Sequence, residues 1–130
     1  QQQVQTLYEQ KNYRKALKVL EQMADNGSVL NLSQVYFSMG ICHFLLKEND
    51  LAVQNFVKVR PAEGIKSKAD WYLTLTYLKQ GDTEKAKEFL GKVVEKEVNV
   101  KHKKKAKELL EQLESELITK IGFSPKSPIL

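Results

Sequence analysis

The chain has 130 residues, enough for one compact unit that buries most of its apolar surface without covalent cross-links. Hydrophobic residues make up 42% and charged residues 28%, as in ordinary globular proteins. The single cysteine, Cys42, excludes an intramolecular disulfide and any multi-cysteine metal site. The net charge of +5 is spread along the chain apart from one cluster at 101–107, which argues against a nucleic-acid-binding domain.

Membrane and targeting signals are missing from the printed residues. No apolar run approaches the roughly 20 residues that span a bilayer, and no basic-then-apolar signal segment opens the chain. Because the sequence begins at Gln1 inside an expected helix, we interpret it as a fragment. We expect a soluble protein, cytoplasmic or periplasmic, the latter if it belongs to an anchored protein; its localisation stays unknown.

Apolar periodicity predicts an all-α chain. Breaker clusters at 25–28 and 61–64 separate pairs of helices, and Gly81 ends another helix. Asn12, Asn49 and Asp82 are expected to cap the second helix of each pair. The predicted helices lie near 1–10, 13–25, 30–47, 50–60, 66–80, 83–97 and 101–120.

Three of these helices repeat one pattern. Ala16, Ala52 and Ala86 recur at a nearly constant interval along the chain. Large apolar residues follow each alanine by four and by seven positions, which places all three residues on one helix face. These large residues are Leu20, Phe56 and Leu90, and then Met23, Val59 and Val93. A small residue beside large ones predicts a helix that approaches its neighbour closely.

The repeated residues resemble the tetratricopeptide repeat family, which has roughly 34 residues per helical hairpin. The third hairpin is the best match, at Leu73, Tyr77, Gly81, Ala86, Leu90 and Val93. Asp70 stands where the family usually has an aromatic residue, Thr74 where it has a small one, and Lys47 where it has the turn glycine. The resemblance implies a short right-handed α-solenoid of antiparallel hairpins whose first helices line a concave groove for partner proteins.

The expected domain covers residues 1–121. Its hairpins lie at about 1–25, 30–60 and 66–97. A one-sided helix at about 101–120, with an apolar stripe through Ala106 and Leu109, is expected to cap the array. Residues 122–130 contain two prolines and are expected to form an extended or disordered tail.

Two first helices carry apolar residues on a second face, which hairpin packing does not explain. This face predicts an apolar groove for a partner's peptide or helix, with a lysine rim. The expected contact residues are Phe37, Ile41, Phe44, Lys68, Trp71, Leu75 and Lys79. An equally open interpretation is that the protein fills this groove itself, with the last helix, the tail or residues before Gln1.

Catalytic and metal chemistry find no support in the residues. Cys42 and His43 are adjacent in a predicted helix and point about 100° apart, so they cannot pair with each other. The only other histidine, His102, lies far away in the sequence, and the glycines form no phosphate loop. We therefore expect no enzyme, no metal and no cofactor.

The basic cluster from Lys101 to Lys107 supplies the alternative function. Its lysines could contact nucleic acid or an anionic surface, although no aromatic or arginine residues are interleaved with them. The main hypothesis remains a non-catalytic interaction module, and assembly of a homodimer through the same groove is a third alternative.

Overall fold

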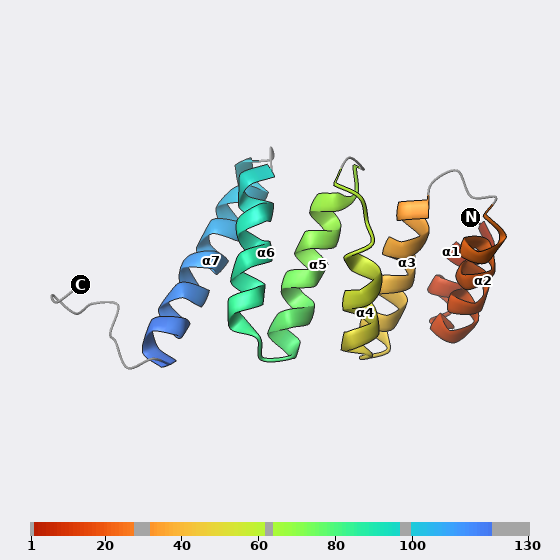
Figure 1. The fold of residues 1–130 in the computed structure, drawn as a ribbon, viewed down its shortest axis with the longest axis horizontal. Helices are drawn as coiled ribbons and strands as arrows, with labels where there is room; N and C mark the ends of the chain where they lie inside the picture. Colours follow the sequence, from red (N-terminus) through yellow and green to blue (C-terminus); the bar gives the residue numbers. More distant parts are fainter. Residues whose placement is uncertain (1, 28–31, 62–63, 97–99, 121–130) are drawn as a thin grey trace, which may run out of the picture.

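Seven helices make up the described part of the chain. The computed structural model describes residues 2–27, 32–61, 64–96 and 100–120, and within these ranges there is no strand. Figure 1 shows the helices as a row in chain order. They are α1 (Gln2–Glu9), α2 (Tyr13–Asn26), α3 (Leu32–Leu45), α4 (Asn49–Phe56), α5 (Lys66–Lys79), α6 (Thr83–Lys96) and α7 (Val100–Lys120).

Each helix packs against the next one along the chain, and α3 also contacts α5. The first helices of the second and third hairpins therefore meet, as they do in a solenoid that buries a continuous core by stacking repeats. The all-α, tetratricopeptide-like fold predicted from the sequence is confirmed. The predicted tail at 122–130 lies outside the described residues.

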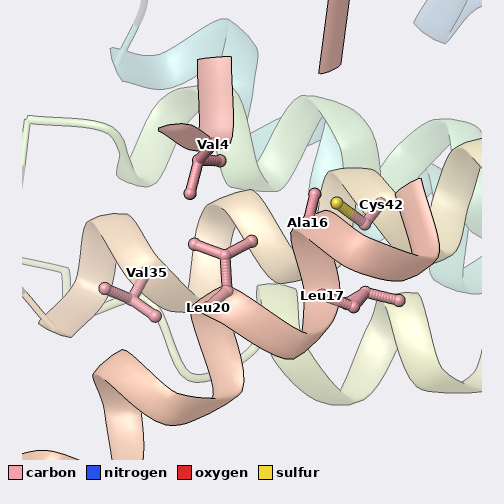
Figure 2. Close-up of a cluster of buried hydrophobic side chains, with 6 residues drawn as sticks. All are labelled: Val4, Ala16, Leu17, Leu20, Val35 and Cys42. Carbon is pink, nitrogen blue, oxygen red and sulfur yellow. The ribbon is translucent and has the colours of Figure 1, made fainter. Parts of the chain in front are cut away.

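The three repeated alanines occupy the centre of the hairpins. Ala16, Ala52 and Ala86 are all fully buried, and each belongs to a different apolar cluster. Figure 2 shows the first cluster, in which residues of α2 are grouped with Val4, Val35 and Cys42. Since a small side chain lets two helix backbones approach, the alanines set the spacing at which the large residues fill the core.

Gly40 lets the Phe56 side chain of α4 pack directly against α3. A Cβ atom at this position would lie 2.5 Å from Cε1 of Phe56, whose side chain is fully buried. Only a residue without a side chain fits against that ring, so Gly40 determines how deeply Phe56 enters the hairpin.

The three hairpin turns share one backbone conformation. Lys11, Lys47 and Gly81 occupy equivalent positions and have φ values of 58°, 64° and 76°. The next amide donates to a carbonyl five residues back in each turn, as from Asp82 N to Tyr77 O at 2.9 Å. This left-handed conformation favours glycine, so two of the turns hold a lysine in a costly geometry.

Two of the three predicted caps are confirmed. Asn12 Oδ1 accepts a hydrogen bond from Lys15 N at 3.4 Å, and Asp82 Oδ1 accepts one from Lys85 N at 3.1 Å. The prediction for Asn49 is wrong, because α4 begins at Asn49 and the position equivalent to Asn12 and Asp82 is Glu48. The Glu48 carboxylate makes no cap bond and binds side chains from two other helices instead.

Helix α4 is shorter than predicted. It ends at Phe56 and not near residue 60. Lys58 N donates to Asn55 O and Val59 N to Phe56 O, three residues back, so the final turn tightens before Pro61. Arg60 N then donates to Ser33 Oγ at 3.2 Å, which joins the end of this hairpin to the start of α3. Val59 nevertheless stays buried, as its place in the repeat predicted.

Candidate functional site

The seven predicted contact residues lie on α3 and α5, the first helices of two successive hairpins. All five apolar members are partly buried, and the two lysines are exposed. The structure divides the seven between two neighbouring places. Phe37, Ile41 and Phe44 pack in the cluster around Phe56, whereas Trp71 packs on the cluster around Leu90. Leu75 lies on α5 beyond Trp71, one turn closer to Lys79.

Tyr72 covers much of the predicted aromatic surface on α3. Its ring centroid lies 5.9 Å from that of Phe37 and 5.4 Å from that of Phe44, in edge-on arrangements. It also stacks on Phe56 at 5.8 Å. These distances are those of attractive aromatic pairs, so Tyr72 joins the second and third hairpins. Part of the second apolar face of α3 therefore packs against the next repeat and is not free for a partner.

Lys79 completes this contact. Its Nζ atom lies 3.7 Å from the centroid of the Phe44 ring, a cation–π distance. The lysine was predicted to form a rim beside α5, and its charge in fact lies over an aromatic ring of the preceding hairpin.

A pocket opens next to Trp71, between α5 and α7. Its volume is about 390 Å³, in the range of sites that hold small ligands or large side chains. The apolar part of its lining comes from three helices, with Trp71 and Tyr72 on α5, Val93 on α6 and Ala106 on α7. Lys68 and Lys105 supply its charge, and Ser67 completes the lining.

The sequence assigned Lys105 to the basic cluster at 101–107, and its place in the pocket beside Trp71 was not predicted. A signal for it existed, because Phe37, Trp71 and Lys105 follow one another at equal intervals, each the length of one repeat. Helix α7 thus continues the register of the first helices and adds a lysine where α3 and α5 have aromatic residues. Tyr72 was missed for a different reason, since its contacts depend on how two hairpins are rotated against each other.

The remaining lysines of the basic cluster do not line the pocket. Lys101, Lys104 and Lys107 are exposed, and Lys103 is partly buried. They point in several directions around α7 because their spacings do not follow one helix face. Within the cluster, Lys105 alone of the described side chains joins the apolar lining.

Cys42 and His43 point to different neighbours. Cys42 is fully buried beside Tyr8, and burial raises the pKa of its thiol, which disfavours the nucleophilic thiolate. The Tyr8 hydroxyl donates to Ser38 O at 2.6 Å. His43 Nδ1 lies 2.9 Å from Glu48 Oε1, so its ring is engaged in the turn between α3 and α4.

Glu48 links the first two hairpins. Arg14 on α2 donates to both of its carboxylate oxygens, at 3.1 and 2.7 Å. The hydrogen bonds from Arg14 and His43 lower the pKa of the Glu48 carboxyl below its ordinary value. Arg14, His43 and Glu48 therefore bind one another, and none of the three lines the pocket beside Trp71.

No group of side chains suited to a metal ion occurs among the residues that the structure describes. Within the same residues, no helix is both long enough and apolar enough to cross a bilayer.

Comparison with known proteins supports the fold. Residues 68–97, which cover most of α5 and all of α6, match the family model of the tetratricopeptide repeat. The structure resembles that of SycD, the type III secretion translocator chaperone of Yersinia enterocolitica, with a TM-score of 0.77 at 16% identity. The match covers 89% of this chain and 81% of SycD. No curated protein matches the sequence.

Proposed function

We propose that this tetratricopeptide-repeat-like protein is a non-catalytic interaction module that holds a peptide or helix of a partner protein. The observation that carries the proposal is the pocket of about 390 Å³ beside Trp71, open between two first helices. A folded core normally fills such space with its own side chains. Tryptophan is also among the residues that most often anchor protein contacts.

The surroundings of Trp71 fit this role. The side chain is partly buried against α6 and keeps part of its surface free at the pocket. Leu75 lies one turn further along α5, and Phe37, Ile41 and Phe44 on α3 are partly buried, so each leaves some apolar surface for a partner. A partner segment could therefore anchor one side chain beside Trp71 and run along α5 toward α3.

The fold neighbour supports the same class of function. SycD is named as a type III secretion translocator chaperone. At 16% identity the likeness extends to the fold, and the partner of this chain has to be inferred from its own groove.

Trp71 is the only tryptophan, so its emission reports on the groove directly. Peptides that lack tryptophan can be selected on the immobilised protein from a displayed random library and then titrated against it. Binding in the groove should shift or quench the emission. We expect Trp71→Ala to weaken the selected peptides at least about tenfold and Leu75→Ala to weaken them less.

The matched control is Val57→Ala, which removes an apolar side chain that is 50% exposed and lies outside the groove. Circular dichroism would establish that each variant keeps its helices. Phe37→Ala is a poor variant for this purpose, because the Phe37 ring packs against the rings of Phe56 and Tyr72, with centroid distances of 5.9 Å. Its removal would disturb the core as well as the groove. Equal affinity in the wild type and the Trp71→Ala variant would contradict the proposal.

Removal of residues 122–130 tests the self-filled alternative. If the tail competes for the groove, the shortened chain should bind the selected peptides more tightly and show altered Trp71 emission without any peptide. Unchanged affinity and emission would show that the tail does not occupy the groove.

A further inference from the structure

We infer that the segment held beside Trp71 is acidic and apolar: an anchor side chain enters the pocket while flanking carboxylates contact Lys68 and Lys105. This inference rests on the proposed function and specifies the chemistry of the partner. Its basis is the juxtaposition, across one pocket, of an apolar lining and two lysines contributed by different helices.

The charge of the pocket is uncompensated. In the described part of the chain, its lining contains two lysines and no carboxylate. Among the described residues, neither Lys68 nor Lys105 takes part in an ion pair, whereas the nearby Lys66 is paired with Asp70 at 2.9 Å. Two cations beside an apolar lining lower their mutual repulsion when an anion lies between them. An acidic ligand is therefore attracted by both lysines, and a basic ligand would be repelled by them.

The apolar lining distinguishes this site from a general polyanion surface. Trp71, Tyr72, Val93 and Ala106 offer dispersion contacts and no hydrogen-bond acceptors other than the tyrosine hydroxyl. A sugar–phosphate backbone would meet the lysines and leave this lining uncovered. An acidic segment with an aromatic or aliphatic anchor uses both parts of the pocket at once.

The chain's own tail fits the pocket less well. Residues 121–130 contain Lys126 and no Asp or Glu, so its side chains cannot supply the missing negative charge. Charge complementarity thus favours a segment from another protein as the occupant.

The test varies the charge on both sides of the contact. The probe is a fluorescein-labelled peptide of about ten residues in which Glu alternates with Leu and Phe, and its companion has Gln in place of every Glu. Fluorescence anisotropy measures both affinities. We expect the wild type to bind the Glu peptide about tenfold or more tightly than the Gln peptide at low salt.

The ratio of the two affinities is the readout. In the double variant Lys68→Gln, Lys105→Gln, this ratio should fall to nearly one. The control Lys104→Gln, Lys107→Gln removes the same charge from exposed positions on α7 outside the pocket, and its ratio should stay within about threefold of the wild type. All four lysines are exposed, so both double variants should fold.

Several results would overturn the inference. Equal loss of the ratio in both double variants, or equally tight binding of an all-Glu peptide without apolar residues, would show diffuse polyanion binding. A stable dimer that excludes the probe would assign the pocket to a second copy. If the Gln peptide binds as tightly as the Glu peptide and depends on Trp71, the proposed function stands and the acidic preference falls. If no probe binds, the inference falls as well.

Discussion

Gly40 on α3 lies so close to Phe56 on α4 that a Cβ atom at position 40 would stand 2.5 Å from one carbon of the ring and 2.6 Å from another. The ring is fully buried, with neighbours at Phe37 and Tyr72, so it cannot swing away freely. The spacing of the second hairpin, and hence the place of the aromatic residues between α3 and α5, depends on this contact.

The first prediction concerns this glycine. Gly40→Ala should lower the free energy of unfolding by about 2 kcal/mol, because overpacking outweighs the gain in helix propensity. Urea denaturation followed by circular dichroism measures the change. Gly91→Ala is the matched control on α6, since no described atom beyond the backbone of α6 and the two chain neighbours lies within 4 Å of a Cβ there. It should stabilise by about 1 kcal/mol. Stabilisation by both changes would show that Phe56 yields without cost.

The second prediction concerns the turns. Lys11→Gly and Lys47→Gly should each stabilise the protein by about 1 kcal/mol, because glycine adopts the left-handed conformation without a steric penalty. Gly81→Ala should destabilise it by a similar amount at the equivalent turn. Thermal or urea denaturation of the three single variants decides the matter. A loss of stability at position 47 would mean that the lysine side chain makes a favourable contact in the turn.

The third prediction concerns a buried charge on α5. Asp70 is fully buried where the repeat family has an aromatic residue, and Lys66 Nζ contacts its Oδ1 at 2.9 Å. Neither carboxylate oxygen has a hydrogen-bond partner of good geometry in the described part of the chain. The ion pair with Lys66 is therefore the interaction that offsets the burial of the Asp70 charge. Lys66→Ala should destabilise by about 3 kcal/mol, because the carboxylate would remain buried without a partner.

The double variant Lys66→Met, Asp70→Leu is the companion to that change. Replacing both charges by apolar groups of similar size should restore stability to near the wild-type value or above it. Urea denaturation compares the single and double variants. A double variant as unstable as Lys66→Ala would contradict the interpretation of the pair as a net electrostatic cost.

The fourth prediction is a pH dependence at Glu48. Hydrogen bonds from Arg14 and His43 lower the pKa of this carboxyl in the folded state. The unfolded state therefore binds a proton first, and the stabilisation is present above the ordinary pKa of about 4.3 and lost as the pH falls through the lower native value. Glu48→Gln should flatten the decline of stability below that ordinary pKa. Denaturation at several pH values measures this dependence. Arg14→Gln, which removes one of the two donors, should flatten the plot of stability against pH only partly. An unchanged slope in both variants would refute the assignment of this pH dependence to Glu48.

Much of the fold followed from local spacing. The nearly constant interval between Ala16, Ala52 and Ala86 predicted three hairpins, and all three alanines are fully buried. Helix bounds agreed within a few residues, except at α4, where the last turn tightens before Pro61. Local pattern was informative because the face that a helix buries is set by its own periodicity.

The candidate site was predictable only in part. Phe37, Phe44 and Trp71 were expected to share one groove, and the structure places Tyr72 against the two phenylalanines and a pocket beside the tryptophan. The role of Glu48 was also missed. Its carboxylate stands at a cap position by sequence, yet Arg14 and His43 bind it from other helices.

The sequence by itself determined which residues share the buried face of each helix, since contacts at three and four residues along a helix follow from its pitch. The tertiary structure decided what lies between hairpins: Tyr72 over the α3 aromatics, Lys79 over Phe44, and Lys105 across the pocket from Lys68. These contacts depend on the rotation and distance between successive repeats. Helix packing sets both quantities through many side chains at once, so no single spacing in the sequence encodes them.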